Sequence, residues 1–140
     1  MNLVEQLLKA DSKKADELET GVFKSHKLAK ILGVEAETVD VQIREIKSRR
    51  VNDIVSYQID KKGNFDYSKS YDAKIMMCIE GVMDPDLKDK DLQKHFGVDN
   101  AKDLCEKLFG NEITALSDEI SRISGVAEAD GEDTEDKVKN

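Results

Sequence analysis

Three kinds of residue in this chain have side chains that could do chemistry: an acidic run at residues 84–91, two cysteines and two histidines. The acidic run suggests calcium, because an EF-hand loop supplies oxygen ligands at positions 1, 3 and 5, glycine at position 6 and glutamate at position 12. Counted from Asp84, positions 5, 6 and 12 hold Lys88, Asp89 and His95. Since all three differ, we expect no metal site, and the run predicts a turn followed by a capped helix N-terminus.

The two cysteines, Cys78 and Cys105, lie in separate apolar segments without the Cys-x-x-Cys spacing of metal and redox sites. A cysteine nucleophile needs an activating base, and neither His26 nor His95 has the glycine-rich or acidic surroundings of a catalytic triad. The chain also has no phosphate-binding glycine loop and no Gly-x-Ser-x-Gly or His-Glu-x-x-His motif. We therefore predict that both thiols are core residues, and that the protein is not an enzyme and binds no cofactor.

The net charge and the apolar runs of the sequence argue against two classes of partner, nucleic acids and membranes. Lys and Arg number 22 against 30 Asp and Glu, which gives the 140-residue chain a formal net charge of −8. Nucleic-acid binding needs a surplus of cations, and the basic run at residues 47–50 has no aromatic residues between its charges, so we expect no nucleic acid. No apolar run approaches the roughly 20 residues of a membrane span, and the first eight residues lack the basic start of a signal peptide. Together with the isolated thiols, this predicts a cytoplasmic protein that binds no membrane.

The first twenty residues predict an amphipathic segment and a tether. Leu3, Val4, Leu7 and Leu8 have the spacing of one helical face. So short a helix is unstable by itself, and its apolar face must dock either on the rest of the chain or on a partner. The polar stretch behind it, residues 11–20, reads as the tether.

A short β element is expected next. Residues 22–27 predict a strand that leads into a helical turn, and Gly33 is placed to cap the end of that turn. In residues 38–46 polar residues alternate with three apolar ones, as in a half-buried strand: Val39, Val41 and Ile43.

Two helices are then predicted from apolar residues at helical spacing, the second being the most apolar segment of the chain. Ser48 is placed to cap the first. Gly81 weakens the end of the second, and Pro85 stops it. The two apolar faces consist of Val51, Ile54, Val55 and Ile59, and of Tyr71, Ile75, Ile79 and Val82.

Three further helices are expected between Pro85 and residue 126, each followed by a glycine. Asn100 and Asn111 are placed to cap the last two. The final helix has an apolar stripe of four residues: Ile113, Leu116, Ile120 and Ile123.

The predicted fold class is therefore α+β, predominantly α, with a short two-stranded β element near the N-terminus followed by a cluster of about five helices. Residues 1–20 form the amphipathic segment and tether, and residues 21–126 form a single globular domain. From Glu128 onward the periodicity ends and six acidic residues stand against two lysines, so the end of the chain holds −4 of the net −8. We predict that residues 127–140 are a disordered acidic tail.

The apolar stripes allow two interpretations. The face of the last helix is most simply core, yet with several amphipathic helices and few aromatic residues some apolar surface could remain for a partner. The partner-binding candidates are Leu3, Val4, Leu7, Leu8, Ile113, Leu116, Ile120 and Ile123. The residues alone indicate a small acidic binding module.

Several stretches resemble one known family. They are KLAKILG at residues 27–33, EGVMDPDLKD at 80–89, AKDL at 101–104, KLF at 107–109 and EI at 112–113, together with the closing KVKN at 137–140. Their order and spacing resemble the tail assembly chaperones of long-tailed phages, defective prophages and phage-tail-like bacteriocins of Gram-positive bacteria. The connection at residues 109–113 is shorter than is usual in that family.

The resemblance implies a non-enzymatic protein that binds the tape-measure protein, keeps that long helical polypeptide from aggregating during tail-tube assembly, and is absent from the finished particle. It also implies contact with the tail-tube protein, directly or through a frameshift-extended form, and allows a homo-oligomer. The alternative is a small protein–protein adaptor or regulatory binding module of a phage or its host. A small enzyme would require converging titratable groups in a pocket, which the sequence does not show.

Overall fold

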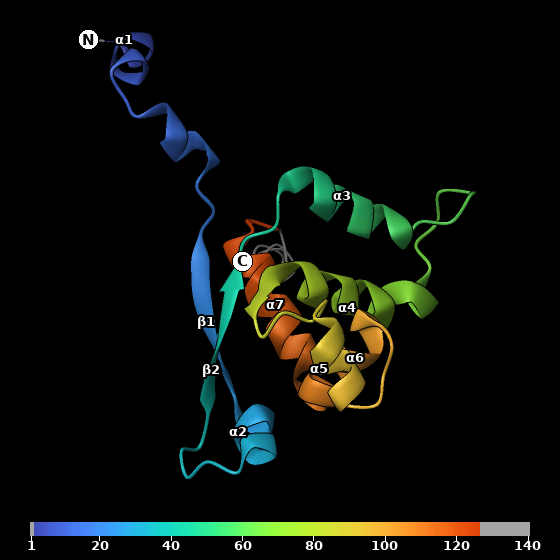
Figure 1. Ribbon diagram of the computed structural model, residues 1–140. Coiled ribbons are helices and arrows are strands. Elements are labelled where there is room, and N and C mark those ends of the chain that lie inside the picture. Colours follow the sequence, from blue (N-terminus) through green and yellow to red (C-terminus); the bar gives the residue numbers. More distant parts are fainter. Residues whose placement is uncertain (1, 127–140) are drawn as a thin grey trace, which may run out of the picture.

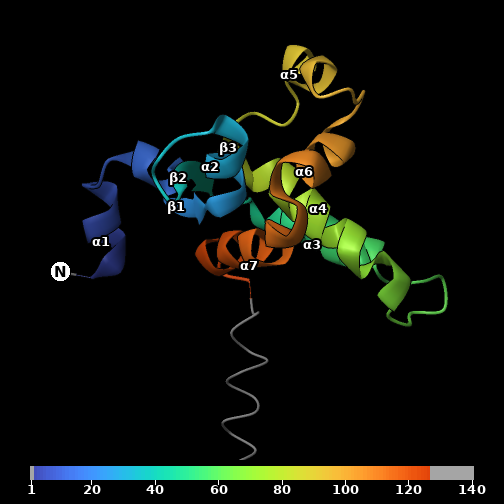
Figure 2. The same cartoon turned by 90° about the horizontal axis from the view of Figure 1, so that it is seen from below.

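The computed structural model describes residues 2–126, so the predicted acidic tail lies outside the described residues. An antiparallel sheet stands beside a cluster of helices, and the N-terminal segment projects from one end of the sheet (Figure 1). Seen from below, the strands and α2 occupy one side of the molecule, while α3 and α4 extend toward the other (Figure 2). No helix in the described part of the chain is long and apolar enough to cross a membrane.

The chain begins with helix α1, Leu3–Leu8, and the 3₁₀ helix η1, Ser12–Asp16. Asn2 caps α1, its side-chain oxygen accepting a hydrogen bond from the backbone N–H of Glu5 at 2.9 Å. Asp11 caps η1 in the same way through the N–H of Lys13. Neither helix contains a buried residue. We refer to residues 2–19, which hold both helices, as the arm.

The sheet has three strands, so the prediction of two was wrong. Strand β1, Thr20–Ser25, pairs antiparallel with β2, Val39–Arg44, and β2 pairs antiparallel with β3, Val82–Asp84. In β2 the side chains of Val41 and Ile43 are fully buried, which confirms the predicted half-buried strand. The third strand has only three residues, too few for an alternating pattern to reveal it.

Helix α2, His26–Leu32, follows β1 directly. Ser25 caps its start, its Oγ accepting from the N–H of Leu28 at 3.1 Å. Gly33 ends the helix at φ +68°, a left-handed conformation that glycine adopts without a steric cost, as predicted.

Helices α3, Ser48–Tyr57, and α4, Ser70–Gly81, are joined by a turn and the 3₁₀ helix η2, Tyr67–Lys69. The predicted cap was off by one residue: Ser48 is the first residue of α3, and Lys47 occupies the cap position without a side-chain hydrogen bond. Ile59, predicted on the helical face, lies beyond α3 in a β-bridge with Phe65.

Helix α4 is the central helix, in contact with α3, α6 and α7. Because neighbours surround it, its buried residues do not form the single predicted stripe: Ile75 is buried, whereas Tyr71 is exposed. The helix stops at Gly81, earlier than Pro85 predicts, because Val82 pairs with Ile43 in the sheet.

Gly81, the last residue of α4, also has a role that was not predicted. A Cβ atom there would lie 2.4 Å from Cγ2 of Ile120 and 2.8 Å from its Cδ1. The glycine therefore allows the end of α4 to approach α7 closely. This contact was invisible in the sequence because the two residues are far apart along the chain.

Three helices complete the chain: α5, Lys90–His95, α6, Ala101–Phe109, and α7, Ile113–Ile123. The side chain of Asp89 caps α5 through the N–H of Leu92, which confirms that the acidic run forms a turn and a cap. Asn100 caps α6 through the N–H of Asp103, as predicted.

The predicted cap of α7 was wrong. Asn111 lies inside the 3₁₀ helix η3, Gly110–Glu112, and Glu112 holds the cap position without a side-chain hydrogen bond. Because η3 runs directly into α7, the carbonyl of Gly110 accepts the N–H of Ile113. The core between these helices and the sheet includes the fully buried side chains of Leu104, Cys105, Phe109, Ile113, Leu116 and Ile120.

Candidate partner-binding surface

Exposed apolar side chains gather in three regions, namely the arm, the connection between α3 and α4, and α2; single ones also lie on other elements, such as Val55 of α3 and Met83 of β3. The arm is the most exposed, with solvent-accessible fractions of 65–81% for Leu3, Val4, Leu7 and Leu8. A six-residue helix is marginal in water without tertiary contacts. The arm therefore presents an apolar helical face that the described chain leaves uncovered.

The connection between α3 and α4 carries exposed aromatic residues. Phe65 and Tyr67 stack edge to face at 4.5 Å between ring centroids, and Nζ of Lys69 lies 5.2 Å from the ring centre of Tyr57. The side chain of Asp60 accepts hydrogen bonds from the N–H groups of Lys62 and Asn64, which holds the turn in one conformation. In both views this connection extends from the helices on the side away from the sheet (Figures 1 and 2).

The side chain of Asp66 fixes the other side of the same connection. Its carboxylate accepts from the N–H of Ser68 at 3.0 Å and from its Oγ at 2.6 Å, and these hydrogen bonds hold the pKa of Asp66 below its ordinary value. The aromatic side chains are therefore displayed on an ordered turn rather than on a loose loop.

Helix α2 lies between two hollows that share Ile31. One of them, here called the α2 hollow, has a volume of about 280 Å³ and is bounded by α2, β2, the start of the 84–89 turn, α5 and α6. Eight of its lining residues are apolar, and two are acidic, Asp40 and Asp84. The apolar ones are Leu28, Ile31, Leu32, Val39, Pro85, Leu92, Phe96 and Leu108.

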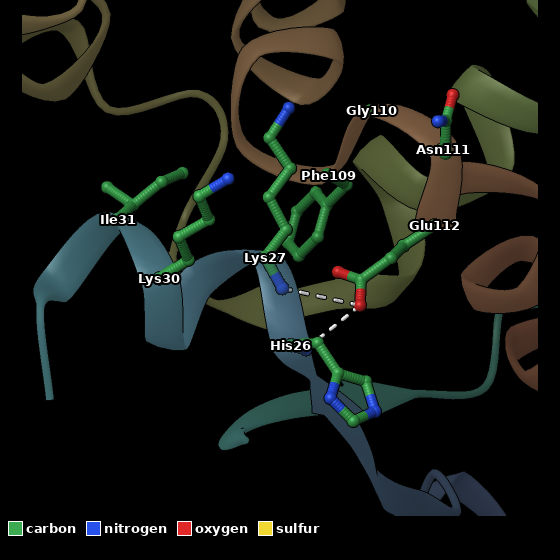
Figure 3. Close-up of a pocket in the computed structure, with 8 residues that line it drawn as sticks. All are labelled: His26, Lys27, Lys30, Ile31, Phe109, Gly110, Asn111 and Glu112. Carbon is green, nitrogen blue, oxygen red and sulfur yellow. Dashed lines mark hydrogen bonds between the residues drawn. The ribbon is translucent and has the colours of Figure 1, made fainter. Parts of the chain in front are cut away.

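The second hollow, of about 720 Å³, lies between α2 and η3 (Figure 3). Glu112 closes its inner side: Oε1 accepts from Oγ of Ser25 at 2.6 Å, and Oε2 accepts from the backbone N–H of His26 at 2.9 Å and of Lys27 at 3.5 Å. This carboxylate satisfies the first amides of α2 and interacts favourably with the positive end of the helix. The protein thus supplies its own anion there.

Lys27 and Gly110 meet at the rim of this second hollow. A Cβ on Gly110 would lie 2.6 Å from Nζ of Lys27, and Gly110 has φ +48°. The positive φ of Gly110 is the reason a glycine is favoured there, because the end of the Lys27 side chain is flexible and could move aside.

The residues considered for catalysis and metal binding do not assemble into a reactive centre. Cys78 and Cys105 are free and fully buried, and the hydrogen bond between them, together with burial, raises the pKa of the Cys78 thiol far above its ordinary value. His26 is exposed, with Nδ1 3.8 Å from the carboxylate of Glu37. Across residues 2–126 no group of three or more His, Cys, Asp or Glu side chains could hold a metal ion.

The fold is similar to that of a solved protein. The crystal structure of the protein YqbN superposes with a TM-score of 0.56 over 78% of this chain and 88% of that chain, at 14% sequence identity. At this identity the likeness concerns the fold alone. None of the curated proteins compared with the chain matches it significantly.

A family model decides the identity. The model of the XkdN-like phage tail assembly chaperones matches residues 4–139, nearly the whole chain. The chain belongs to this chaperone family. The resemblance found in the sequence is thereby confirmed.

In this chaperone the predicted partner-binding residues divide into two groups. The four in α1 are highly exposed, whereas Ile113, Leu116 and Ile120 have no exposed surface and Ile123 is partly buried against the core. The α7 stripe is therefore part of the core, which is the simpler of the two interpretations that the sequence allowed. In this fold Ile113, Leu116 and Ile120 have no surface that a partner could contact.

Two surfaces of the chaperone were missed in the sequence. The connection between α3 and α4, with its exposed aromatic residues, could have been found from the sequence, since Phe65 and Tyr67 stand next to the turn-forming residues 60–64. The α2 hollow had no such local signal, because its lining comes from residues within 28–40 and 84–96 and from Leu108, which only the tertiary fold brings together.

Proposed function

We propose that this chaperone binds the tape-measure protein during tail assembly, keeps it from aggregating, and is displaced as the tail tube forms. Membership of the tail assembly chaperone family supports the assembly role. The observation that carries the binding role is the uncovered apolar face of α1, whose leucines are 69–81% exposed at the end of a polar tether. A long helical client with exposed apolar surface needs such contacts.

The charge of the chain suits this role. A formal net charge of −8 keeps a coated client–chaperone complex dispersed by mutual repulsion. Contacts made by a short helix are individually weak, and many weak contacts along a client can be released one by one when tube subunits arrive. We place this activity in the host cytoplasm and propose that the tail-tube protein is a second partner, met directly or through a frameshift-extended form of the chain.

Co-expression with the tape-measure protein tests the proposal. We expect the tape-measure protein to stay in the soluble fraction and to co-purify with the wild-type chain. The double variant Leu7→Ser/Leu8→Ser should lose most of the co-purified client while keeping its circular dichroism spectrum, since neither leucine packs in the core.

A matched control is Val55→Ser, which removes an exposed apolar side chain from α3 instead of α1. This variant should retain the client. The proposal fails if the tape-measure protein is equally soluble with and without the wild-type chain. If the α1 double variant still co-purifies with the tape-measure protein, α1 is not part of the binding surface.

A further inference from the structure

We propose that residues 128–136, here called the acidic segment, bind in the same molecule to a cationic hollow at the start of α3. The inference concerns the chaperone without its client. It therefore holds or fails separately from the proposed function.

The cationic hollow lies between the connection from β2 to α3 and the end of α4, and has a volume of about 350 Å³. A lysine outside its lining reaches its edge, since Nζ of Lys88 lies 4.0 Å from a carboxylate oxygen of Glu80. Positive side chains thus outnumber negative ones. The cations are Arg44, Lys47, Arg50 and Lys88, and the acids are Glu45 and Glu80.

The two acids of the hollow already have partners. Glu80 accepts a hydrogen bond from Nε of Arg50 at 3.0 Å, and the carboxylate of Glu45 accepts a backbone N–H of the arm at 2.7 Å. Within residues 2–126 the exposed Lys47 forms no ion pair, and Nε of Arg44 donates to the backbone carbonyl of Glu80 at 3.5 Å. The hollow therefore keeps positive charge that the described chain leaves unbalanced.

The arm does not supply the missing anion. Leu18 of the arm lines the hollow, and three acidic residues stand next to it in the sequence, Asp16, Glu17 and Glu19. None of these carboxylates forms an ion pair with the hollow in the described part of the chain. The counter-charge for the hollow therefore comes from outside residues 2–126.

The chain leaves the described structure beside this hollow. Oγ of Ser124 accepts the backbone N–H of Ile46, a residue that lines the hollow, at 2.9 Å. Val126, the last described residue, lines a neighbouring hollow together with Val51 of α3. Figure 1 accordingly shows the end of α7 next to the connection from β2 to α3. The next residues of the chain therefore start close to the cations.

These next residues carry the complementary charge. Within residues 128–136 six side chains are acidic and none is basic. The stretch 127–136 spans up to about 33 Å when extended, so the acidic segment is long enough to reach the hollow. The acidic residues are Glu128, Asp130, Glu132, Asp133, Glu135 and Asp136.

The short connection selects the same molecule as the source of this segment. A segment joined to its binding surface by a few residues has an effective concentration in the millimolar range. A second copy or a separate acidic protein has to compete with it from a lower concentration. Exposed ion pairs are individually weak, so several carboxylates act together. Docking neutralises the hollow, which then attracts other anionic partners less strongly.

Carbodiimide cross-linking of the purified full-length chain tests the proposal. The reagent joins a carboxylate to a lysine amine where the two are in contact. We expect cross-links from the acidic segment to Lys47 and Lys88 at low salt. Their yield should fall about tenfold in roughly 1 M NaCl, where the Debye length is about 3 Å.

Two matched variants, each reversing two exposed charges, locate the contact. Arg44→Glu/Lys88→Glu changes the hollow and keeps Lys47 as the reporter. The control, Lys61→Glu/Lys62→Glu, changes the connection between α3 and α4. Cross-linking to Lys47 should fall about fivefold or more in the hollow variant and stay unchanged in the control. Circular dichroism spectra like that of the wild type show that both variants are folded.

An isotope mixture identifies the molecule that supplies the segment. When ¹⁵N-labelled and unlabelled chains are mixed in equal amounts before cross-linking, a contact within one molecule gives cross-linked peptides of a single isotope. A contact between two copies gives mixed-isotope peptides as well. We expect single-isotope peptides.

Four results would overturn the proposal. These are the absence of cross-links from the acidic segment to Lys47 and Lys88, a yield that the hollow variant leaves unchanged, and equal yields at Lys61 and Lys62. The fourth is the appearance of mixed-isotope peptides, which would make a second copy the source of the segment.

Discussion

Helices α1 and α7 of this chaperone have the same kind of apolar stripe but differ in how far that stripe is buried. In α7, Ile113, Leu116 and Ile120 are completely buried, whereas the apolar residues of α1 are at least 65% exposed. The spacing of the residues predicts an amphipathic helix in both cases. Whether an apolar stripe is buried depends on the rest of the chain. The same spacing of apolar residues can therefore give a buried helix face in one place and an exposed one in another.

The difference has an identifiable physical cause. Helix α7 contacts α4, α6 and the first two strands, and Gly81 allows α4 to reach Ile120 closely. Helix α1 is separated from the body by a polar tether and has no buried residue. A stripe becomes core where neighbouring elements supply complementary apolar surface, and remains exposed where they do not.

The largest effect expected from this comparison is the contrast between Leu116→Ala and Leu7→Ala. The first removes a fully buried side chain and should lower the free energy of unfolding by about 2–5 kcal/mol. The second removes an exposed one and should change it by at most about 0.5 kcal/mol. Urea unfolding followed by circular dichroism measures both. Equal losses would mean that α1 belongs to the core.

A smaller effect is expected at the contact that buries the α7 stripe. Gly81→Ala forces its new methyl group against Ile120 and should destabilise the fold by about 1–3 kcal/mol. Gly21→Ala is the matched control, because its Cβ would meet Ile43 at an ordinary 3.5 Å. In an Ile120→Ala background the cost of Gly81→Ala should shrink, since the two residues are coupled. An unchanged cost would place the strain elsewhere.

The smallest effect concerns the thiols. Cys78 lies in the core, its Sγ 3.8 Å from the carbonyl of Ile113, and should resist alkylation in the native protein, whereas a cysteine introduced by Leu8→Cys should react at once. The pKa of Cys78 is raised on folding from an ordinary value of 9.0. The native thiol therefore keeps its proton at pH values where the unfolded thiol has lost it.

Because the native state then binds more protons than the unfolded state, stability should fall as the pH rises above about 9, by up to about 1.4 kcal/mol per pH unit. Urea unfolding at pH 8 and pH 10 measures this loss. The dependence should decrease in Cys78→Ala. Rapid alkylation of the native wild type would contradict the burial of both thiols.

The sequence predicted the features that depend on neighbouring residues. The cap at Asn100, the left-handed Gly33 and the alternation in β2 follow from side chains a few positions apart, and all were found. The family was predicted from ordered short stretches and confirmed by a match over residues 4–139.

Features that depend on distant residues were missed. Strand β3 forms because Val82 meets Ile43, and the cap of α7 was misplaced because η3 runs into the helix. The α2 hollow joins several elements, and the burial of the α7 stripe depends on Gly81. Local periodicity contains no information about these contacts, which arise only when the chain closes on itself.

The bond between Glu112 and the start of α2 has a consequence for the order of events on the ribosome. Ser25 and His26 are synthesised 87 and 86 residues before the carboxylate that holds them. Strand β1 packs against α7, so this contact can form only after α7 has been synthesised. Contacts between such distant residues form late and slowly. The arm therefore leaves the ribosome before the body to which it is tethered can fold, and another protein can meet it at that stage.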